Sequence, residues 1–135
     1  MRGLYLITND DPLEVLLAKL EGAFANGGIA VLQYRRKKVT KEDQVYEVEY
    51  MKALCAEYAV PFVINDDLEM AVKYGVGVHL GQDDGSIADA AAQLPQGVLI
   101  GCSCNNSLEL AEQAIADGAN YVAFGAIYAT DTKPE

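Results

Sequence analysis

The chain has 135 residues, 51% of them hydrophobic, and a formal net charge of −10. That length suits one globular core and is too short for two ordinary domains, so we expect residues 1–135 to form a single domain. No segment approaches the ~20 apolar residues of a membrane span, no basic-then-apolar leader opens the sequence, and nucleic acids favour basic surfaces. The composition therefore predicts a cytoplasmic protein with neither a membrane nor a nucleic-acid partner.

Segments typical of strands and helices alternate along the chain. Short apolar runs predict strands over residues 3–7, 29–34, 62–64, 76–80, 98–102 and 121–124. Helical spacing and capping signals predict helices over residues 12–26, 40–58, 67–74, 86–94 and 107–118, with Asp11, Thr40, Ser86 and either Asn106 or Ser107 as N-caps. This alternation predicts a parallel β-sheet covered by helices.

Two α/β architectures fit this order of elements. A doubly wound open sheet is complete with five or six strands, whereas a (β/α)8 TIM barrel has eight strands and typically about 250 residues. No GxGxxG follows the first predicted strand, which weakens the dinucleotide-binding version of the open sheet. Periodicity alone leaves the choice between the two open.

The cysteine pattern agrees with a reducing compartment. Cys55, Cys102 and Cys104 contain no CxxC pair, and an odd number of cysteines cannot all pair within the chain. Two cysteines separated by one residue are too sparse a set for a zinc site. We therefore expect reduced thiols that pack in the core.

Acidic residues follow the third and fourth predicted strands. Asn65, Asp66 and Asp67 end the third strand, and Gln82, Asp83 and Asp84 end the fourth. In a parallel sheet these ends emerge at one edge, where α/β folds place their ligands. Carboxylates there favour a Mg²⁺ site shared with a substrate phosphate. The alternative is structural, because Asp after a strand is a common N-cap and Asp-Gly a common turn.

Other strand ends also carry polar side chains. Gln33-Tyr34-Arg35-Arg36-Lys37-Lys38 follows the second strand, Ser103, Asn105 and Asn106 follow the fifth, and Thr130, Asp131, Thr132 and Lys133 follow the sixth. If the second strand continues, Gln33, Arg35 and Lys37 share one face. Such cations beside carboxylates suit a diphosphate bridged by Mg²⁺, although a basic run alone also suits a solvated surface. His79, inside the fourth strand, is expected to support the fold or the site and not to be a catalyst.

With these residues in view, the sequence resembles the thiamine phosphate synthase (thiamine-phosphate pyrophosphorylase) family. The resemblance extends from Leu4 to Lys133 and rests on six segments in the family's order: LYLIT at 4–8, LQYRRK at 32–37, VINDD at 63–67, GVHLGQDD at 77–84, IGCS at 100–103 and GAIYATDTK at 125–133. It implies a (β/α)8 TIM barrel of which this chain contains about six β/α units. It also implies a transferase that uses Mg²⁺ to join 4-amino-5-hydroxymethyl-2-methylpyrimidine diphosphate to 4-methyl-5-(2-phosphoethyl)thiazole and releases pyrophosphate.

The resemblance implies a role for each matching position. The residues that would bind the pyrimidine diphosphate are Gln33, Tyr34, Arg35, Arg36, Lys37, Asn65, Ser103 and Lys133. Asp66 and Asp84 would bind Mg²⁺, and Thr130, Asp131 and Thr132 would bind the thiazole phosphate. Arg35, Ser103 and Lys133 would be the catalytic residues, acting on the departing pyrophosphate.

The sequence departs from the family pattern in three respects. Asn105 stands where the family usually has His, Val76 stands where Asp is common, and the last two β/α units do not follow Lys133. Two alternatives therefore stay open: a thiazole tautomerase of the same fold, and an inactive protein that only binds phosphate compounds. We also expect the sheet edges at residues 3–7 and 121–124 to be exposed, which would let copies of the chain associate.

Overall fold

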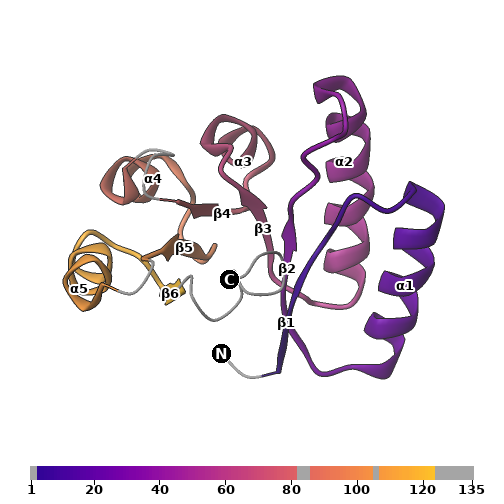
Figure 1. Ribbon diagram of the computed structural model, residues 1–135, viewed down its shortest axis with the longest axis horizontal. Coiled ribbons are helices and arrows are strands. Elements are labelled where there is room, and N and C mark those ends of the chain that lie inside the picture. Colours follow the sequence, from indigo (N-terminus) through magenta and orange to yellow (C-terminus); the bar gives the residue numbers. More distant parts are fainter. Residues whose placement is uncertain (1–2, 82–85, 105–106, 124–135) are drawn as a thin grey trace. The chain divides into compact units, whose positions relative to one another are not determined.

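The computed structural model describes residues 3–81, 86–104 and 107–123, in which strands and helices alternate as the sequence predicts (Figure 1). The chain forms two compact units, one ending at Phe62 and the other beginning at Val63. We call them the N-terminal and the C-terminal unit. Within the described residues, every helix is too short or too polar to cross a membrane.

The N-terminal unit contains two parallel strands and two helices. Its elements are β1 (Leu4–Ile7), α1 (Leu13–Asn26), β2 (Ile29–Tyr34) and α2 (Lys41–Glu57). In the β1–β2 register, Leu6 lies opposite Leu32 and Ile7 opposite Gln33. The unit ends with Pro61, whose carbonyl oxygen accepts a 2.9 Å hydrogen bond from the Leu32 backbone N–H, and with the first residue of β3.

The C-terminal unit continues the alternation with parallel strands only. Its elements are β3 (Phe62–Asn65), α3 (Leu68–Tyr74), β4 (Gly77–Leu80), α4 (Ile87–Gln93), β5 (Ile100–Ser103), α5 (Leu108–Ala116) and β6 (Tyr121–Ala123). Within this unit the strands lie in the order β3-β4-β5-β6, which is their order in the chain. A doubly wound sheet reverses its strand order at a switch point, whereas barrel strands follow one another. The sequential order therefore agrees with the barrel class.

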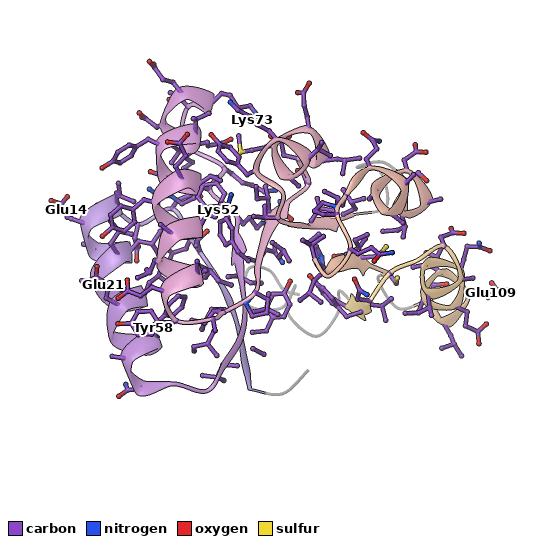
Figure 2. The ribbon with its side chains drawn as sticks, turned by 180° about the vertical axis from the view of Figure 1, so that it is seen from behind. Glu14, Glu21, Lys52, Tyr58, Lys73 and Glu109 are labelled. Atoms are coloured by element: carbon purple, nitrogen blue, oxygen red, sulfur yellow. The ribbon has the colours of Figure 1, made fainter. Side chains whose placement is uncertain are left out.

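The apolar faces of the helices cover the strands of their own unit. In α1, Leu16, Leu20 and Phe24 are buried, whereas Leu13 and Leu17 are half-buried. In α2, the buried residues are Glu47, Val48, Met51, Leu54 and Cys55. The labelled carboxylates Glu14, Glu21 and Glu109 project outward from α1 and α5 (Figure 2).

Three predicted N-caps are confirmed. The hydroxyl groups of Thr40, Ser86 and Ser107 accept backbone hydrogen bonds from the third residue after each of them, at the starts of α2, α4 and α5. Of the two candidates for the N-cap of α5, Ser107 holds that position. The other candidate, Asn106, lies outside the described residues. Since a capping hydroxyl satisfies an otherwise orphaned N–H, these serines and threonines explain where the helices begin.

The prediction of Asp11 as the N-cap of α1 is wrong. Pro12 holds that position in an extended conformation, with φ −53° and ψ 143°, and its carbonyl accepts the first helical bond, from Leu16. The Asp11 carboxylate instead forms an ion pair with Lys19 at 3.0 Å. The helix therefore begins one residue later than predicted.

Candidate functional site

The side chains at the carboxyl end of β2 differ in exposure to solvent. Gln33 is buried, and its Nε2 donates a 2.8 Å hydrogen bond to the Tyr5 hydroxyl. Arg35 and Lys37 are exposed. A shared face for Gln33, Arg35 and Lys37 would require β2 to continue beyond Tyr34. The strand ends at Tyr34, and Lys37 lies in a turn. Two cations nevertheless lie at the surface directly after this strand.

Tyr34 and Arg36 point into the N-terminal unit and share one partner, Glu47 of α2. Arg36 Nε and Nη2 donate to Glu47 Oε1 and Oε2, both at 3.0 Å, and the Tyr34 hydroxyl donates to Oε1 at 2.7 Å. The Arg36 and Glu47 residues are only 5% and 4% exposed. Arg36 Nη1 also donates to the carbonyl oxygens of Asn9 and Asp11, in the loop after β1.

Electrostatics agree with a structural role for these two residues. The hydrogen bonds to Glu47 raise the pKa of Arg36, so its guanidinium stays charged. Burial, and then the bond to Glu47, raise the pKa of Tyr34, so its hydroxyl stays protonated. Tyr34 and Arg36 were expected to bind the pyrimidine diphosphate. The geometry favours a different role, since their polar groups are directed to Glu47 and to backbone carbonyls.

The backbone around Arg35 is held from the loop after β1. The Thr8 hydroxyl accepts from the Arg35 N–H at 2.7 Å and donates to the Arg35 carbonyl at 3.0 Å. Three residues on, the Lys38 N–H donates to Asp10 Oδ1 at 3.1 Å. The exposed cations are therefore carried by a backbone with fixed hydrogen bonds on both sides.

In the C-terminal unit, consecutive aspartates follow β3 with different functions. Asp67 is the N-cap of α3, because its Oδ1 accepts from the Met70 N–H at 3.0 Å. Asp66 is exposed and adopts a left-handed conformation with φ 62°, and its N–H donates to the His79 carbonyl at 2.7 Å. The capping alternative thus applies to Asp67.

A row of polar residues crosses the C-terminal unit. In the strand registers Asn65 lies opposite His79, His79 opposite Gly101, and Gly101 opposite Tyr121. Neighbours in register point to the same face of a sheet, and so does Ser103, two residues after Gly101. The expected diphosphate ligands Asn65 and Ser103 therefore share one face with His79.

His79 connects two hydroxyl groups on that face. Its Nε2 lies 2.7 Å from Ser103 Oγ, and its Nδ1 lies 3.0 Å from the Tyr121 hydroxyl. With the proton on Nε2, His79 donates to the Ser103 hydroxyl oxygen, so the Ser103 proton is not used in this contact. With the proton on Nδ1, Ser103 donates to His79 instead. His79 is 5% exposed, which agrees with the expected supporting role.

The described residues fit part of a magnesium site. Among them, no group of three or more His, Cys, Asp and Glu side chains is placed to hold a metal ion. Mg²⁺ is often held by only one or two carboxylates, the remaining ligands being water and substrate phosphate. The exposed carboxylate of Asp66 at a strand end is compatible with that mode. Its expected companion Asp84 lies outside the described residues, as do Thr130, Asp131, Thr132 and Lys133.

Sequence reasoning missed several residues that shape these strand ends. Glu47, Thr8, Tyr5 and Tyr121 were not singled out, although each contacts an expected site residue or its neighbour. One signal was present for Glu47, since a charged residue stands among the apolar positions of α2 beside Val48 and Met51. A buried carboxylate requires a partner, and the basic run supplied the only arginines among the described residues.

The described residues form a parallel β/α fold with polar and charged groups at the carboxyl ends of its strands, which is where TIM-barrel proteins place their active sites. Comparison with known proteins agrees with that class. Residues 4–135 match the thiamine monophosphate synthase family, and the chain belongs to this family.

A solved structure supports the same assignment. The chain is similar to thiamine phosphate pyrophosphorylase from Pyrococcus furiosus, with a TM-score of 0.79 and 29% sequence identity. The match covers 96% of this chain and 62% of that protein. The expected fold class is thereby confirmed: an α/β fold of the TIM-barrel class, of which the described residues contain six parallel strands.

Proposed function

We propose that this chain is a thiamine phosphate synthase, which joins 4-amino-5-hydroxymethyl-2-methylpyrimidine diphosphate to 4-methyl-5-(2-phosphoethyl)thiazole. Family membership over residues 4–135 carries the proposal. By the family resemblance, Arg35, Lys37, Asn65, Ser103 and Lys133 would bind the pyrimidine diphosphate. We place the reaction in the cytoplasm, because the three cysteines are buried and form no disulfide, as is usual in a reducing compartment.

The proposed reaction needs no base and no protein nucleophile. The bond between the pyrimidine methylene carbon and the diphosphate oxygen breaks, and its electron pair leaves with pyrophosphate. The thiazole nitrogen then donates its lone pair to the methylene carbon, which forms the new C–N bond. The protein has to hold the two reactants in line and to stabilise the charge that develops on the leaving group.

The chain's own residues supply that stabilisation. Arg35 offers a bidentate contact to phosphate oxygens, and Lys37 offers a point charge. Ser103, held by His79, donates its hydroxyl proton to an oxygen of the diphosphate. Thr130, Asp131 and Thr132 bind the thiazole phosphate, as the family resemblance implies.

Asp66 and Asp84 are the proposed ligands of Mg²⁺. When bound, the ion neutralises charge on the diphosphate and makes pyrophosphate a better leaving group. Asp66 supports this assignment because its carboxylate is exposed and the adjacent Asp67 takes the capping role.

The direct test is turnover of both substrates by the purified chain with Mg²⁺, followed as thiamine phosphate and pyrophosphate release. In the Arg35→Ala variant we expect the affinity for pyrophosphate to fall by about 1.5–3 kcal/mol, the value of a charge-assisted hydrogen bond. Lys38→Ala, which removes an exposed cation three residues on, is the matched control and should change affinity much less.

The outcomes separate the alternatives. Turnover that Arg35→Ala weakens supports the synthase. Pyrophosphate binding without turnover identifies a phosphate-binding protein, and conversion of a thiazole substrate alone identifies a tautomerase. Equal losses in Arg35→Ala and Lys38→Ala would remove Arg35 from the site.

A further inference from the structure

The basic run after β2 contains a buried ion pair that phosphate binding does not explain. Arg36 is a bidentate partner of Glu47, with both N···O distances at 3.0 Å, and the Tyr34 hydroxyl adds a 2.7 Å bond to the same carboxylate. A buried pair of this kind is weak evidence for stability, since apolar residues of similar volume often serve as well or better. Its placement therefore needs another explanation.

The placement bears directly on Arg35. The side chains of Tyr34 and Arg36, which flank Arg35 in the chain, are both held against Glu47. Arg35 is exposed, while both its neighbours are buried. Its N–H and carbonyl are also bonded to the Thr8 hydroxyl at 2.7 and 3.0 Å.

The same contacts extend to the loops on both sides of Arg35. Arg36 Nη1 donates to carbonyl oxygens of Asn9 and Asp11, and the Arg36 carbonyl accepts from Gln44 Nε2 of α2 at 3.0 Å. Glu47 thus holds a guanidinium that connects the loop after β1, the segment after β2 and α2. These elements all lie in the N-terminal unit.

We propose that Glu47 is a positioning residue for diphosphate binding: through Arg36 and Tyr34 it fixes the segment of residues 33–38, so that Arg35 and Lys37 are presented in a set orientation. This inference rests on the proposed function for its effect on the substrate. Glu47 also neutralises Arg36, which divides the basic run into one internal cation and three exposed ones, Arg35, Lys37 and Lys38.

The test is Glu47→Gln, measured by calorimetry with inorganic pyrophosphate and Mg²⁺. Charge alone predicts stronger anion binding in this variant, because a carboxylate is lost near the cations. Positioning predicts the opposite sign, and we expect affinity to fall by about tenfold to a hundredfold, as misplaced contacts do. In turnover, the KM for the pyrimidine diphosphate should rise and the KM for the thiazole phosphate should not. Glu57→Gln makes the same chemical change at an exposed position of α2 and is the matched control.

A second variant covers the case in which Glu47→Gln does not fold, since it leaves a buried cation unpaired. The double variant Arg36→Met/Glu47→Leu removes both charges and should fold, with the same loss of pyrophosphate affinity. Wild-type or stronger pyrophosphate binding by either folded variant would overturn the proposal, and stronger binding in Glu47→Gln would make Arg36 itself a phosphate ligand.

Hydrogen exchange separates a failure of this inference from a failure of the proposed function. In the wild-type chain the Arg35 and Lys38 amides are bonded to Thr8 and Asp10, and we expect both to lose protection in the variants. If the wild-type chain binds no pyrophosphate, the proposed function fails while exchange still measures positioning. Unchanged protection of the two amides in a folded variant would overturn positioning by itself.

Discussion

At the scale of single residues, Asp66 and Asp67 carry the same functional group in different local structures. Asp67 caps α3 through Oδ1, whereas Asp66 adopts φ 62° and is exposed. Left-handed backbone is more favourable for Asn and Asp than for other non-glycine residues, and Asn caps helices about as well as Asp. We therefore expect replacement of either residue by Asn to preserve the fold.

This equivalence makes a sharp test of the metal site. We expect Asp66→Asn to weaken Mg²⁺-dependent pyrophosphate binding about tenfold or more, because Mg²⁺ requires hard anionic oxygen ligands. Asp67→Asn should leave that binding unchanged, and both variants should unfold at the wild-type temperature. The measurement is calorimetry of pyrophosphate binding with and without Mg²⁺. Equal effects in the two variants would exclude Asp66 as a specific ligand.

At the scale of elements, Gly101 in β5 leaves room for the Tyr121 side chain of β6 to contact His79 of β4. His79, Gly101 and Tyr121 are successive partners in register, and a Cβ atom at Gly101 would fall on the Tyr121 ring. The Tyr121 ring thus lies over a position without a side chain, where its hydroxyl meets His79 Nδ1 at 3.0 Å. A side chain at position 101 would therefore clash with the ring that bonds to His79.

We therefore expect Gly101→Ala to displace the Tyr121 ring and to break its bond to His79. Because Ser103 then loses an ordered partner, pyrophosphate affinity should fall by about 1 kcal/mol, the usual value of one hydrogen bond. Tyr121→Phe, which removes only the hydroxyl, should give the same loss, and isothermal calorimetry measures both.

The control is Gly22→Ala in α1, where an added Cβ meets no atom within 4 Å. It should stabilise the fold by about 0.5–1 kcal/mol, because alanine favours helix over glycine, and should leave binding as it is. A Gly101→Ala variant with wild-type pyrophosphate affinity would show that the Tyr121–His79 contact does not support Ser103.

The elements themselves were largely predictable because their signals are local. Apolar runs located the six strands within about two residues, and hydroxyl groups at Thr40, Ser86 and Ser107 marked helix starts. Asp11 failed as a cap because its carboxylate pairs with Lys19 and its carbonyl binds Arg36, two contacts that short-range patterns do not encode.

The candidate site was predictable only where it follows strand ends. Asp66 and Ser103 stand there in the sequence, so their placement at the ends of β3 and β5 followed from the strand predictions. The Arg36–Glu47 pair joins a loop to the middle of a helix, and the His79–Tyr121 contact spans 42 positions in the chain. Such pairs depend on the strand register and on burial, which no local pattern contains.

At the scale of the whole molecule, a net charge of −10 opposes the approach of a diphosphate. Arg35, Lys37 and Lys38 nevertheless form a cluster of exposed cations, and salt screens distant charges more than nearby ones. Pairing Arg36 with Glu47 inside the N-terminal unit does not weaken these three. The charge distribution is thus compatible with an anionic substrate, although the composition is acidic.

The buried cysteines should make the free energy of unfolding decrease at alkaline pH. Burial raises the pKa of Cys55 and of Cys102 to about 12, and for Cys102 the neighbouring Cys104 adds to the shift. In the unfolded chain a thiol has a pKa of about 8.5. Above that pH the unfolded state loses protons that the folded state keeps, so these thiols contribute stability that is complete below about pH 8.5 and is lost as pH rises toward 12.

We therefore expect the free energy of unfolding to fall, between about pH 9 and 12, by up to about 1.4 kcal/mol per pH unit for each of the two thiols. Urea unfolding at a series of pH values, with reductant present, measures this slope.

The Cys55→Ala/Cys102→Ala variant is the comparison. We expect a lower stability at pH 7, because the variant loses buried volume, and a shallower decline above pH 9. Lysine and tyrosine titrations are common to both proteins, so the difference between the two slopes isolates the thiols. Parallel pH profiles would mean that these thiols ionise in the folded protein as they do in the unfolded chain, which would contradict the burial of Cys55 and Cys102.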